Sequence, residues 1–523
     1  MKPSVAWLPA LVAAAATVPV PASGSRAYVG GAVVVPLHLH ERSPARRSSF
    51  LALSSGTQSL LEHYRARHNN THAIEYYGYI GVGGQSFSVI FDTGSDSLIL
   101  PGTDCISPAC RTHRLYNASR SSTSRNRTAR ARQCQFGAGT ASGYEREETA
   151  CIGQACADVQ FVEALMESDD PFLHARFDGV LGLSLGLRRN ASGQASVLEA
   201  LAAAGAIPKA LFAVFLAKDM HADASELSLG EWNPARAGGP MTWVPLSEPG
   251  YWQFSLQGIA IGGKEVGGCA GESAALAAGS RVSSFFGKMC CRQVEEFEWE
   301  DRCQFWGNAS DTDDFGDPVE RSRYVDSATV VQSYDDGRLA VRLHDGCLQK
   351  VPRKWLSLED GCQGDGTIQA VLDTGSSLMM APQALTQRIL LALNVSENCT
   401  TQAPESFPAL TLTLPTGRNL TLTSADYMDT VVERDGVFCW PHLMPFPNTA
   451  KGPVLVLGMP FLRAYYTVFD AEGQRVGFAP PQQPAHGGAR RAAPSGSRAA
   501  PRTVGLRGVR PGEAEAAPSA GGP

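Results

Sequence analysis

The sequence predicts a mainly β protein made of two duplicated lobes with a cleft between them, and three observations support this fold class. An internal repeat places Asp-Thr-Gly-Ser after an apolar, strand-like stretch twice, once at Asp92 and once at Asp373. From Ile74 onward, short apolar runs alternate with Gly, Pro, Asn and Asp, which is typical of strands joined by turns. Only two helical runs stand out, at residues 196–205 and 382–393.

Each copy of the repeat has a second part, which is two aliphatic residues followed by a glycine. Gly182 follows Asp92 by 90 residues, and Gly458 follows Asp373 by 85 residues. Four matching letters could arise by chance, but the same strand context with the same delayed partner indicates duplication. Two duplicated lobes can place their loops face to face, so that Asp92 and Asp373 meet in a cleft.

Two carboxyl groups held that close do not both ionise cheaply, so they share one proton and titrate as a pair. The ionised member can take a proton from water while the protonated member polarises a carbonyl group. We therefore expect Asp92 and Asp373 to be catalytic. Glycine allows close approach of the backbone, and the hydroxyls can hold the loops, so we expect support from Thr93, Gly94, Ser95, Thr374, Gly375 and Ser376.

The residue after the first loop is a second acid, Asp96, where the second copy has Ser377. Asp96 is therefore outside the repeated chemistry, and we do not assign proton transfer to it. Two roles stay open for Asp96, which are hydrogen bonding that shapes the loop and contact with a substrate subsite.

With these motifs the chain resembles the pepsin-like aspartic protease family over about residues 33–480, apart from one insertion. The segments FDGVLGL, WVPLSEPGYWQFSL and VLVLGMPFLRAYYTVFD are similar to stretches of both lobes of that family. The resemblance implies a bilobal β fold with the active site in the cleft and hydrolysis of peptide bonds by a water held between Asp92 and Asp373. It also implies that the protein is made as a zymogen and that its reaction needs no cofactor. The sequence has no C-x-x-C or H-E-x-x-H spacing that would indicate a metal site.

The flap departs from the family pattern. The family usually carries a flap tyrosine that is hydrogen-bonded to a tryptophan. Here the segment QFGAGTASG has Phe136 in place of the tyrosine, followed by Gly137 and Gly139, and Ile99 stands in place of the tryptophan. Because both ends of that bond are replaced by apolar groups, neither is left unpaired. We expect a working flap that is held by packing.

The resemblance also suggests how the cysteines pair. It implies the disulfides Cys105–Cys110 and Cys399–Cys439, and it suggests Cys269–Cys362 at the base of the insertion. In the first lobe an odd number then remains, and the sequence does not decide which one is unpaired among Cys134, Cys151 and Cys156.

The insertion, at about residues 267–365, falls just before the second Asp-Thr-Gly. Residues 293–320 are strongly acidic, and the stretch from residue 328 to 361 alternates apolar and polar residues with Asp-Gly turns, which predicts a small β unit. The insertion is either a surface excursion that the fold tolerates, or an exosite for substrate or a module that binds a protein partner.

The remaining parts of the chain suggest export. Residues 1–24 have the charged start, apolar run and small residues of a signal peptide. We expect four segments after it, which are a basic, irregular propeptide at 25–72, an N-terminal lobe at 73–245, a C-terminal lobe at 246–480 and a disordered basic tail at 481–523. Eight N-x-S/T acceptors and thirteen cysteines agree with a disulfide-bonded glycoprotein. We expect it to be secreted or to reside in an acidic endomembrane compartment.

Several function classes are weakened. A net charge of -6 argues against a nucleic-acid binder. After the signal peptide, no stretch of the sequence is apolar enough to span a membrane. We expect a monomer that acts on peptides or proteins. GLSLG resembles a serine-hydrolase motif but lacks the α/β context. The arginine-rich run at 111–132 is expected to be a solvated loop, and the alternatives are that it recognises an anionic substrate near the flap or contacts the acidic insertion. The main rival is a catalytically silent binding or inhibitor protein with the same fold.

Overall fold

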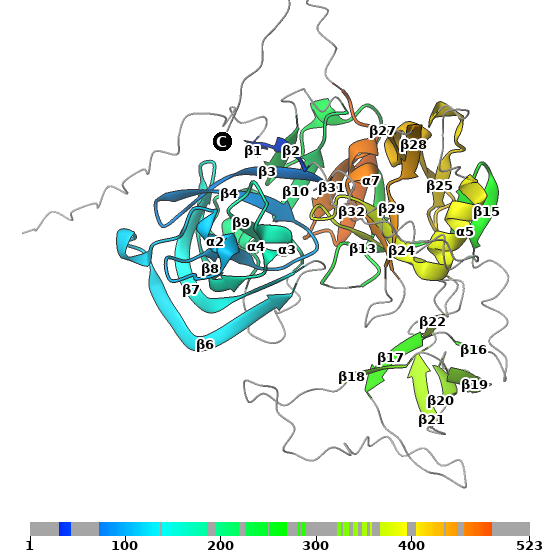
Figure 1. The fold of residues 1–523 in the computed structure, drawn as a ribbon, viewed down its shortest axis with the longest axis horizontal. Coiled ribbons are helices and arrows are strands. Elements are labelled where there is room, and N and C mark those ends of the chain that lie inside the picture. Colours follow the sequence, from blue (N-terminus) through cyan, green and yellow to red (C-terminus); the bar gives the residue numbers. More distant parts are fainter. Residues whose placement is uncertain are drawn as a thin grey trace, which may run out of the picture. The chain divides into compact units, whose positions relative to one another are not determined.

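The computed structural model describes residues 31–42, 73–135, 139–185, 195–218, 225–248, 250–268, 367–394, 404–433, 436–446 and 454–483, with short strands between residues 281 and 357. The predicted tail lies outside these ranges from residue 484 onward. Strands make up most of the described chain (Figure 1), which confirms the mainly β class.

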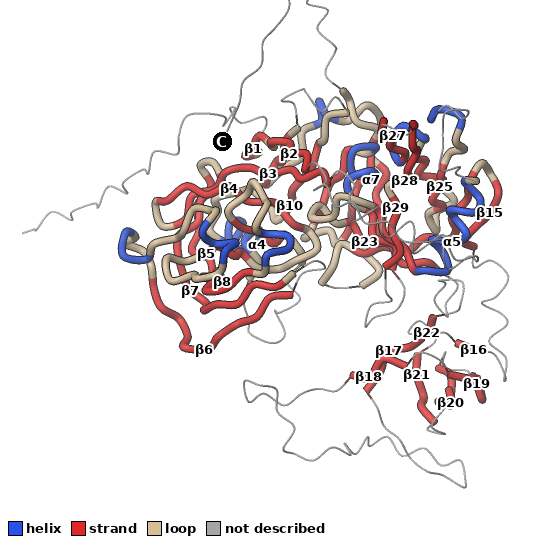
Figure 2. Tube along the Cα trace, in the orientation of Figure 1, coloured by secondary structure: helices blue, strands red, loops and turns tan. Residues whose placement is uncertain are grey.

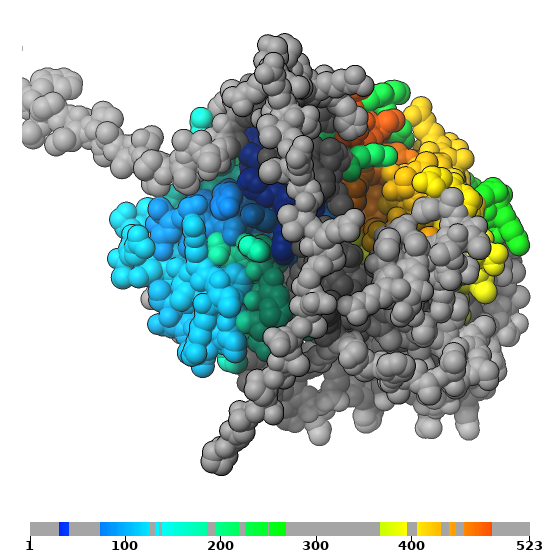
Figure 3. Space-filling model, turned by 45° about the horizontal axis from the view of Figure 1, so that its top comes forward, coloured from blue at the N-terminus to red at the C-terminus, as the bar shows by residue number. Residues whose placement is uncertain are grey.

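The first lobe is built on an eight-stranded sheet. Its first hairpin turns at Gly83 and Gly84, and both residues have positive φ, 56° and 74°, which glycine adopts without strain. Residues of this lobe lie on the face of the molecule that Figure 3 presents, where they are blue and cyan. The sheet order is β2 (His38–Arg42), β3 (Ala73–Val82), β4 (Gln85–Asp92), β9 (Gly179–Gly182), β5 (Leu98–Pro101), β8 (Ala155–Glu167), β7 (Thr140–Ile152) and β6 (Arg125–Gln135).

The second lobe repeats the central pattern in a five-stranded sheet. Its order is β13 (Gln253–Leu256), β23 (Ile368–Leu372), β30 (Val454–Leu457), β24 (Met379–Pro382) and β29 (Leu443–Phe446). In each lobe the strand that leads into Asp-Thr-Gly pairs in parallel with the strand of the delayed motif, β4 with β9 and β23 with β30. The next strand pairs antiparallel with that same partner. The duplication inferred from sequence is therefore also a duplication of strand pairing.

A six-stranded sheet combines segments from both halves of the chain. Its order is β1 (Val33–Pro36), β11 (Glu226–Leu229), β10 (Leu211–Phe215), β31 (Tyr466–Asp470), β32 (Arg475–Ala479) and β12 (Thr242–Pro245). Phe212 and Phe469 stack at 4.4 Å between ring centroids, and Trp252 packs edge-on against both. The Trp252 Nε1 group donates to the Leu183 carbonyl at 2.7 Å, so this aromatic core supports the chain just beyond β9.

The N-terminal segment differs from the expected irregular structure at residues 33–42. These residues form β1, which pairs with β11, and β2, which pairs with β3. The physical reason is the alternation of the segment, since Val33, Val35 and Leu37 are buried.

Two longer helices lie where the sequence predicts them, and Figure 2 shows how few other helical turns the described chain has. Helix α4 (Val197–Ala203) begins with a capping box between Ser196 and Glu199. Helix α5 (Gln383–Leu393) ends at Asn394 in the left-handed conformation. The short helices are α2 (Pro108–Arg111), α3 (Asp169–Phe172), α6 (Ser424–Tyr427) and α7 (Met459–Ala464).

Smaller sheets complete the chain. In the second lobe they comprise β15 (Lys264–Gly268), β14 (Gly258–Ile261), β25 (Leu410–Thr413) and β26 (Asn419–Leu422), and the pair β27 (Met428–Glu433) and β28 (Gly436–Pro441). In the insertion the predicted β unit is present as antiparallel strands β19 (Ala328–Ser333), β20 (Arg338–Leu343) and β21 (Leu348–Pro352). The other insertion strands are β16 (Arg281–Val282), β17 (Ser284–Lys288), β18 (Ser322–Val325) and β22 (Leu356–Ser357). Within the described residues, no helix is long and apolar enough to cross a membrane.

Candidate active site

The two Asp-Thr-Gly loops are held against their own lobes by the residues that flank the delayed glycines of the repeat. The Leu183 amide donates to the Asp92 carbonyl at 2.7 Å, and the Asp373 amide donates to the Leu457 carbonyl at 3.1 Å. A Cβ atom on Gly182 would lie 2.4 Å from the Ser97 nitrogen, and one on Gly458 would lie 2.2 Å from a loop carbonyl oxygen. Any side chain would therefore displace the loop, which explains why each motif ends in glycine.

The two threonines tie the loops of the two lobes together by reciprocal hydrogen bonds. The Thr93 amide donates to Thr374 Oγ1 at 2.9 Å, and the Thr374 amide donates to Thr93 Oγ1 at 2.9 Å. Each hydroxyl in turn donates to a carbonyl of the opposite lobe, Thr93 to Leu372 at 2.8 Å and Thr374 to Phe91. Because Thr93 is fully buried, this network is shielded from competing water.

The two carboxyl groups are held in the same way and face each other's loop. Asp92 accepts hydrogen bonds from the Gly94 amide at 2.9 Å and the Ser95 hydroxyl at 2.5 Å. Asp373 likewise accepts from the amide of Gly375 at 2.8 Å and from the hydroxyl three residues after it at 2.6 Å. A Cβ atom on Gly375 would lie 2.5 Å from Asp92 Oδ1, and one on Gly94 would lie 2.9 Å from Asp373 Oδ1. Each carboxyl thus lies against the glycine of the other loop.

Burial and the neighbouring Asp373 carboxyl together raise the pKa of Asp92 from its ordinary value of 3.8 to about 7. Hydrogen bonds from Ser95 and Gly94 oppose this rise, but they do not cancel it. The shift has the direction expected when two carboxyl groups compete for one negative charge. The pair can therefore hold one proton at mildly acidic pH.

The predicted flap hairpin is formed by β6 and β7. Phe136 and Gly137 lie outside the described residues, whereas Gly139 is described and lies against the Asp170 carbonyl. Ile99 is 1% exposed and belongs to an apolar cluster with Ala141, Val162 and Ala164. The position that holds tryptophan in the family pattern is therefore packed with small and aliphatic side chains from β7 and β8.

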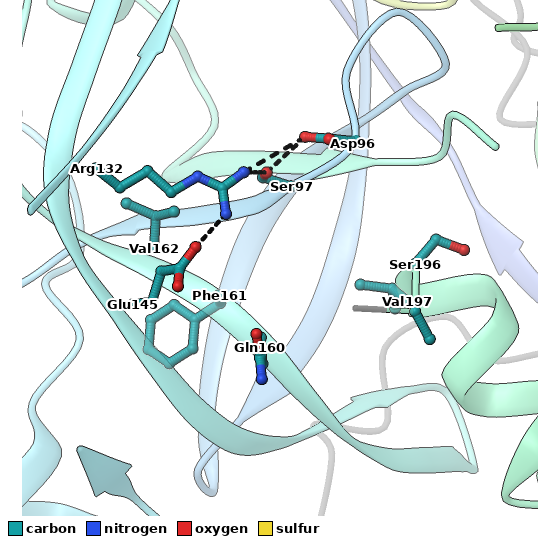
Figure 4. Close-up of a pocket in the computed structure, with 10 residues that line it drawn as sticks. Asp96, Ser97, Arg132, Glu145, Gln160, Phe161, Val162, Ser196 and Val197 are labelled. Carbon is teal, nitrogen blue, oxygen red and sulfur yellow. Dashed lines mark hydrogen bonds and ion pairs between the residues drawn. The ribbon is translucent and has the colours of Figure 1, made fainter. Parts of the chain in front are cut away.

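Asp96 belongs to a polar cluster at the end of the first loop, which Figure 4 shows. It accepts a hydrogen bond from the Ser97 hydroxyl at 2.7 Å, and its Oδ1 lies 3.7 Å from an Arg132 nitrogen. Arg132 also donates to Ser97 at 2.9 Å and pairs with Glu145. These contacts favour the loop-shaping role for Asp96 over the subsite role.

The contacts of Arg132 with Asp96, Ser97 and Glu145 could not be predicted from the sequence. Arg132 is one of several arginines in the 111–132 run, and nothing in its local pattern separates it from the others. Its side chain is only 11% exposed, so at this position the expectation of a solvated loop is wrong. The contact with Asp96 requires the pairing of β6 with β7, which local sequence does not specify.

Two disulfides are present in the described part of the first lobe, Cys105–Cys110 and Cys151–Cys156. Of the three cysteines left open by the sequence, Cys134 on β6 keeps its thiol. In the second lobe Cys439 is disulfide-bonded, and its predicted partner lies outside the described residues, as do Cys269 and Cys362. No cluster of metal-ligating side chains occurs among the described residues.

Comparison with known proteins agrees with this geometry. A family model described as eukaryotic aspartyl protease matches residues 75–286 and 350–481, leaving a gap inside the predicted insertion. Aspartic proteinase A3 of Arabidopsis thaliana is 30% identical over 447 residues, which cover 77% of this chain and 83% of the relative. Cathepsin E of Cavia porcellus is 35% identical over 192 residues, 36% of this chain and 49% of the relative.

Phytepsin of Hordeum vulgare is 37% identical over 209 residues, 39% of this chain and 41% of the relative. The matches thus span about half the length of cathepsin E or phytepsin and most of proteinase A3. The family model covers both Asp-Thr-Gly loops, and the structure joins them in one site. The chain therefore belongs to the eukaryotic aspartyl proteases, a family of aspartic-type endopeptidases with a pepsin-like bilobal fold.

Proposed function

We propose that this protein is an aspartic endopeptidase that hydrolyses peptide bonds with a water molecule activated between Asp92 and Asp373. The observation that carries the proposal is the reciprocal site, in which each carboxyl lies against the glycine of the other loop. The raised pKa of Asp92 supports it, because a pair that shares one proton contains both a base and an acid.

The proposed reaction uses both protonation states at once. The ionised carboxyl takes a proton from the water, whose oxygen attacks the carbonyl carbon of the peptide bond, while the protonated carboxyl gives its proton to the carbonyl oxygen. The resulting tetrahedral diol collapses when one hydroxyl returns a proton to the pair and the nitrogen takes one, so the C–N bond breaks. The amides of Gly94 and Gly375 and the hydroxyls of Ser95 and Ser376 hold the carboxylate oxygens in place throughout.

The test is cleavage of a peptide library from pH 3 to 7 by the wild type, Asp92→Asn and Asp373→Asn. We expect cleavage by the wild type alone, with apolar side chains preferred around the cleaved bond, as the family resemblance implies. Activity that survives either substitution would sink the mechanism. A wild type that binds peptides without cleaving them would favour the rival, a catalytically silent binding or inhibitor protein of this fold, which the two intact loops argue against.

We further propose that the protein is a secretory zymogen whose propeptide spans residues 25–72. The signal-like residues 1–24, the eight glycosylation acceptors and the two first-lobe disulfides support passage through the secretory pathway. The basic propeptide would lie against an acidic mature protein, so acid would weaken the attachment by protonating carboxylates. Its strands β1 and β2 are paired in two sheets, so its removal would uncover the edges of β11 and β3.

A further inference from the structure

We propose that Arg132 is a positioning residue that clamps the catalytic loop to the flap hairpin. The inference rests on the proposed function, because it assigns Arg132 a part in the same reaction. The hydrogen bonds and ion pairs of Arg132 reach Ser97, Asp96 and Glu145 rather than either catalytic carboxyl, so it would act through the residues that follow Asp92.

The guanidinium joins two structural elements with separate nitrogens. Its Nη2 group donates to the Ser97 hydroxyl at 2.9 Å and lies 3.7 Å from Asp96 Oδ1, while its Nη1 group donates to Glu145 on β7 (Figure 4). The side chains of Arg132, Asp96 and Glu145 are only 11%, 16% and 18% exposed. A rigid planar fork of this kind fixes direction as well as distance, which a lysine cannot do.

The loop needs this support on the side that the backbone does not hold. Backbone bonds from Gly182 to Ser97 at 3.0 Å and from Ser184 to Ser95 at 2.9 Å fix the loop against β9. The Ser97 hydroxyl donates to Asp96 and accepts from Arg132, so both of its roles are used and its orientation is set. Because Ser95 also binds the Asp92 carboxyl, a shift of residues 96 and 97 would move a group that holds the catalytic oxygen.

The clamp also supplies a link that the sequence lacks elsewhere. Phe136 and Ile99 replace the hydrogen-bonded pair by which the family joins the flap to this loop. Arg132 lies four residues before Phe136 on the flap strand, and Ser97 lies two residues before Ile99 on the loop. The contact between Arg132 and Ser97 therefore joins the same two elements, the flap strand and the catalytic loop, a few residues from the positions of the missing pair.

The charge of Arg132 matters as well as its shape. The titratable groups that face the cluster are Asp96, Glu145 on β7 and Tyr251, whose pKa is raised by burial and by Asp96. With Arg132 the two carboxylates and one guanidinium leave one net negative charge. Without it the cluster would carry two net negative charges beside the loop that bears Asp92, and the added negative charge would make the catalytic pair harder to ionise.

A substrate-binding role for this cluster is not favoured. Asp96, Ser97, Arg132 and Glu145 line a cavity of about 30 Å³ together with Gln160, Phe161 and the start of α4. By the same measure one water needs roughly 10–15 Å³, so the cavity is too small for a substrate side chain.

The experiment compares kcat, KM and the pH profile of the wild type, Arg132→Met and Arg132→Lys, with Arg146→Met as the matched control. Arg146 pairs with the buried Glu163 in the same sheet but is not in the cluster on the catalytic loop. For Arg132→Met we expect kcat to fall by at least about tenfold with little change in KM, and both limbs of the pH profile to move up by roughly half a pH unit. Arg132→Lys should lower kcat but leave both limbs in place, because the charge remains.

Amide hydrogen exchange of the segment 92–101 provides a readout that does not need activity. We expect faster exchange there in Arg132→Met and unchanged exchange in Arg146→Met. A wild type without peptidase activity would refute the proposed function. The exchange measurement would still show whether Arg132 holds the catalytic loop in place. If Arg132→Met matches Arg146→Met in kcat, in both limbs and in loop exchange, Arg132 is not a positioning residue.

Discussion

Replacing Thr93 by valine should uncouple the two catalytic loops without leaving a cavity, because valine has nearly the same shape as threonine. The substitution removes the hydroxyl that donates to the Leu372 carbonyl at 2.8 Å and accepts from the Thr374 amide at 2.9 Å. Each net hydrogen bond contributes about 1 kcal/mol, and each buried group left without a partner costs about 1–3 kcal/mol. We therefore expect the free energy of unfolding to fall by about 2–4 kcal/mol. Misplaced loops should also lower kcat by roughly 10- to 100-fold.

The matched control is Thr386→Val on α5. Thr386 is also fully buried, but its hydroxyl makes one hydrogen bond, to the Ala381 carbonyl at 3.0 Å within the second lobe. Chemical denaturation should show a loss of about 1 kcal/mol for this control, and kcat per active site should stay unchanged. If Thr93→Val loses no more stability and no more kcat than Thr386→Val, the threonine hydrogen bonds do not couple the two loops.

The remaining predictions concern pH, the flap, the insertion and activation. The pKa of Asp92 is raised from 3.8 to about 7, so the folded state holds a proton that the unfolded chain releases above about pH 4. Its contribution to stability is present below that pH and is lost as the pH rises toward 7; denaturation at pH 4 to 7 should show this slope, and Asp92→Asn should flatten it. Phe136→Tyr should raise kcat/KM by less than tenfold, because Ile99 sits in an apolar cluster that offers no polar group for the hydroxyl; a larger gain would overturn the packed flap. Deleting residues 270–361 should change cleavage of a short peptide and of a protein substrate equally, whereas a selective loss on the protein would show that the insertion binds it. Incubation at pH 4 should yield an active chain that N-terminal sequencing finds to begin near residue 73, and an active chain that retains residues 33–42 would show that they are not a propeptide.

The parts of the fold that could be predicted from sequence are those with local signals. Each catalytic loop contains the Asp-Thr-Gly-Ser motif, the hairpin at Gly83 and Gly84 has turn residues, and α4 has a capping box from Ser196. Their local chemistry needs no knowledge of distant segments.

The parts that could not be predicted depend on long-range pairing. The strand β1 is held in place by pairing with β11, which lies almost two hundred residues later. The sequence around β1 is rich in arginine and contains proline, so the short alternating pattern of β1 does not stand out as a strand. Arg132 reaches Asp96 only after β6 has paired with β7, so its role depends on register. A one-residue slip would turn the guanidinium to the other face of the sheet.

The most direct test of the shared-proton pair is kcat/KM at pH 5 for Asp92→Asn and Asp373→Asn, measured on protein shown by denaturation to be folded. We expect each substitution alone to lower kcat/KM by at least about 10³-fold, since either change removes the base or the acid that the other carboxyl needs. A folded variant of either kind that keeps more than one tenth of the wild-type value would contradict it.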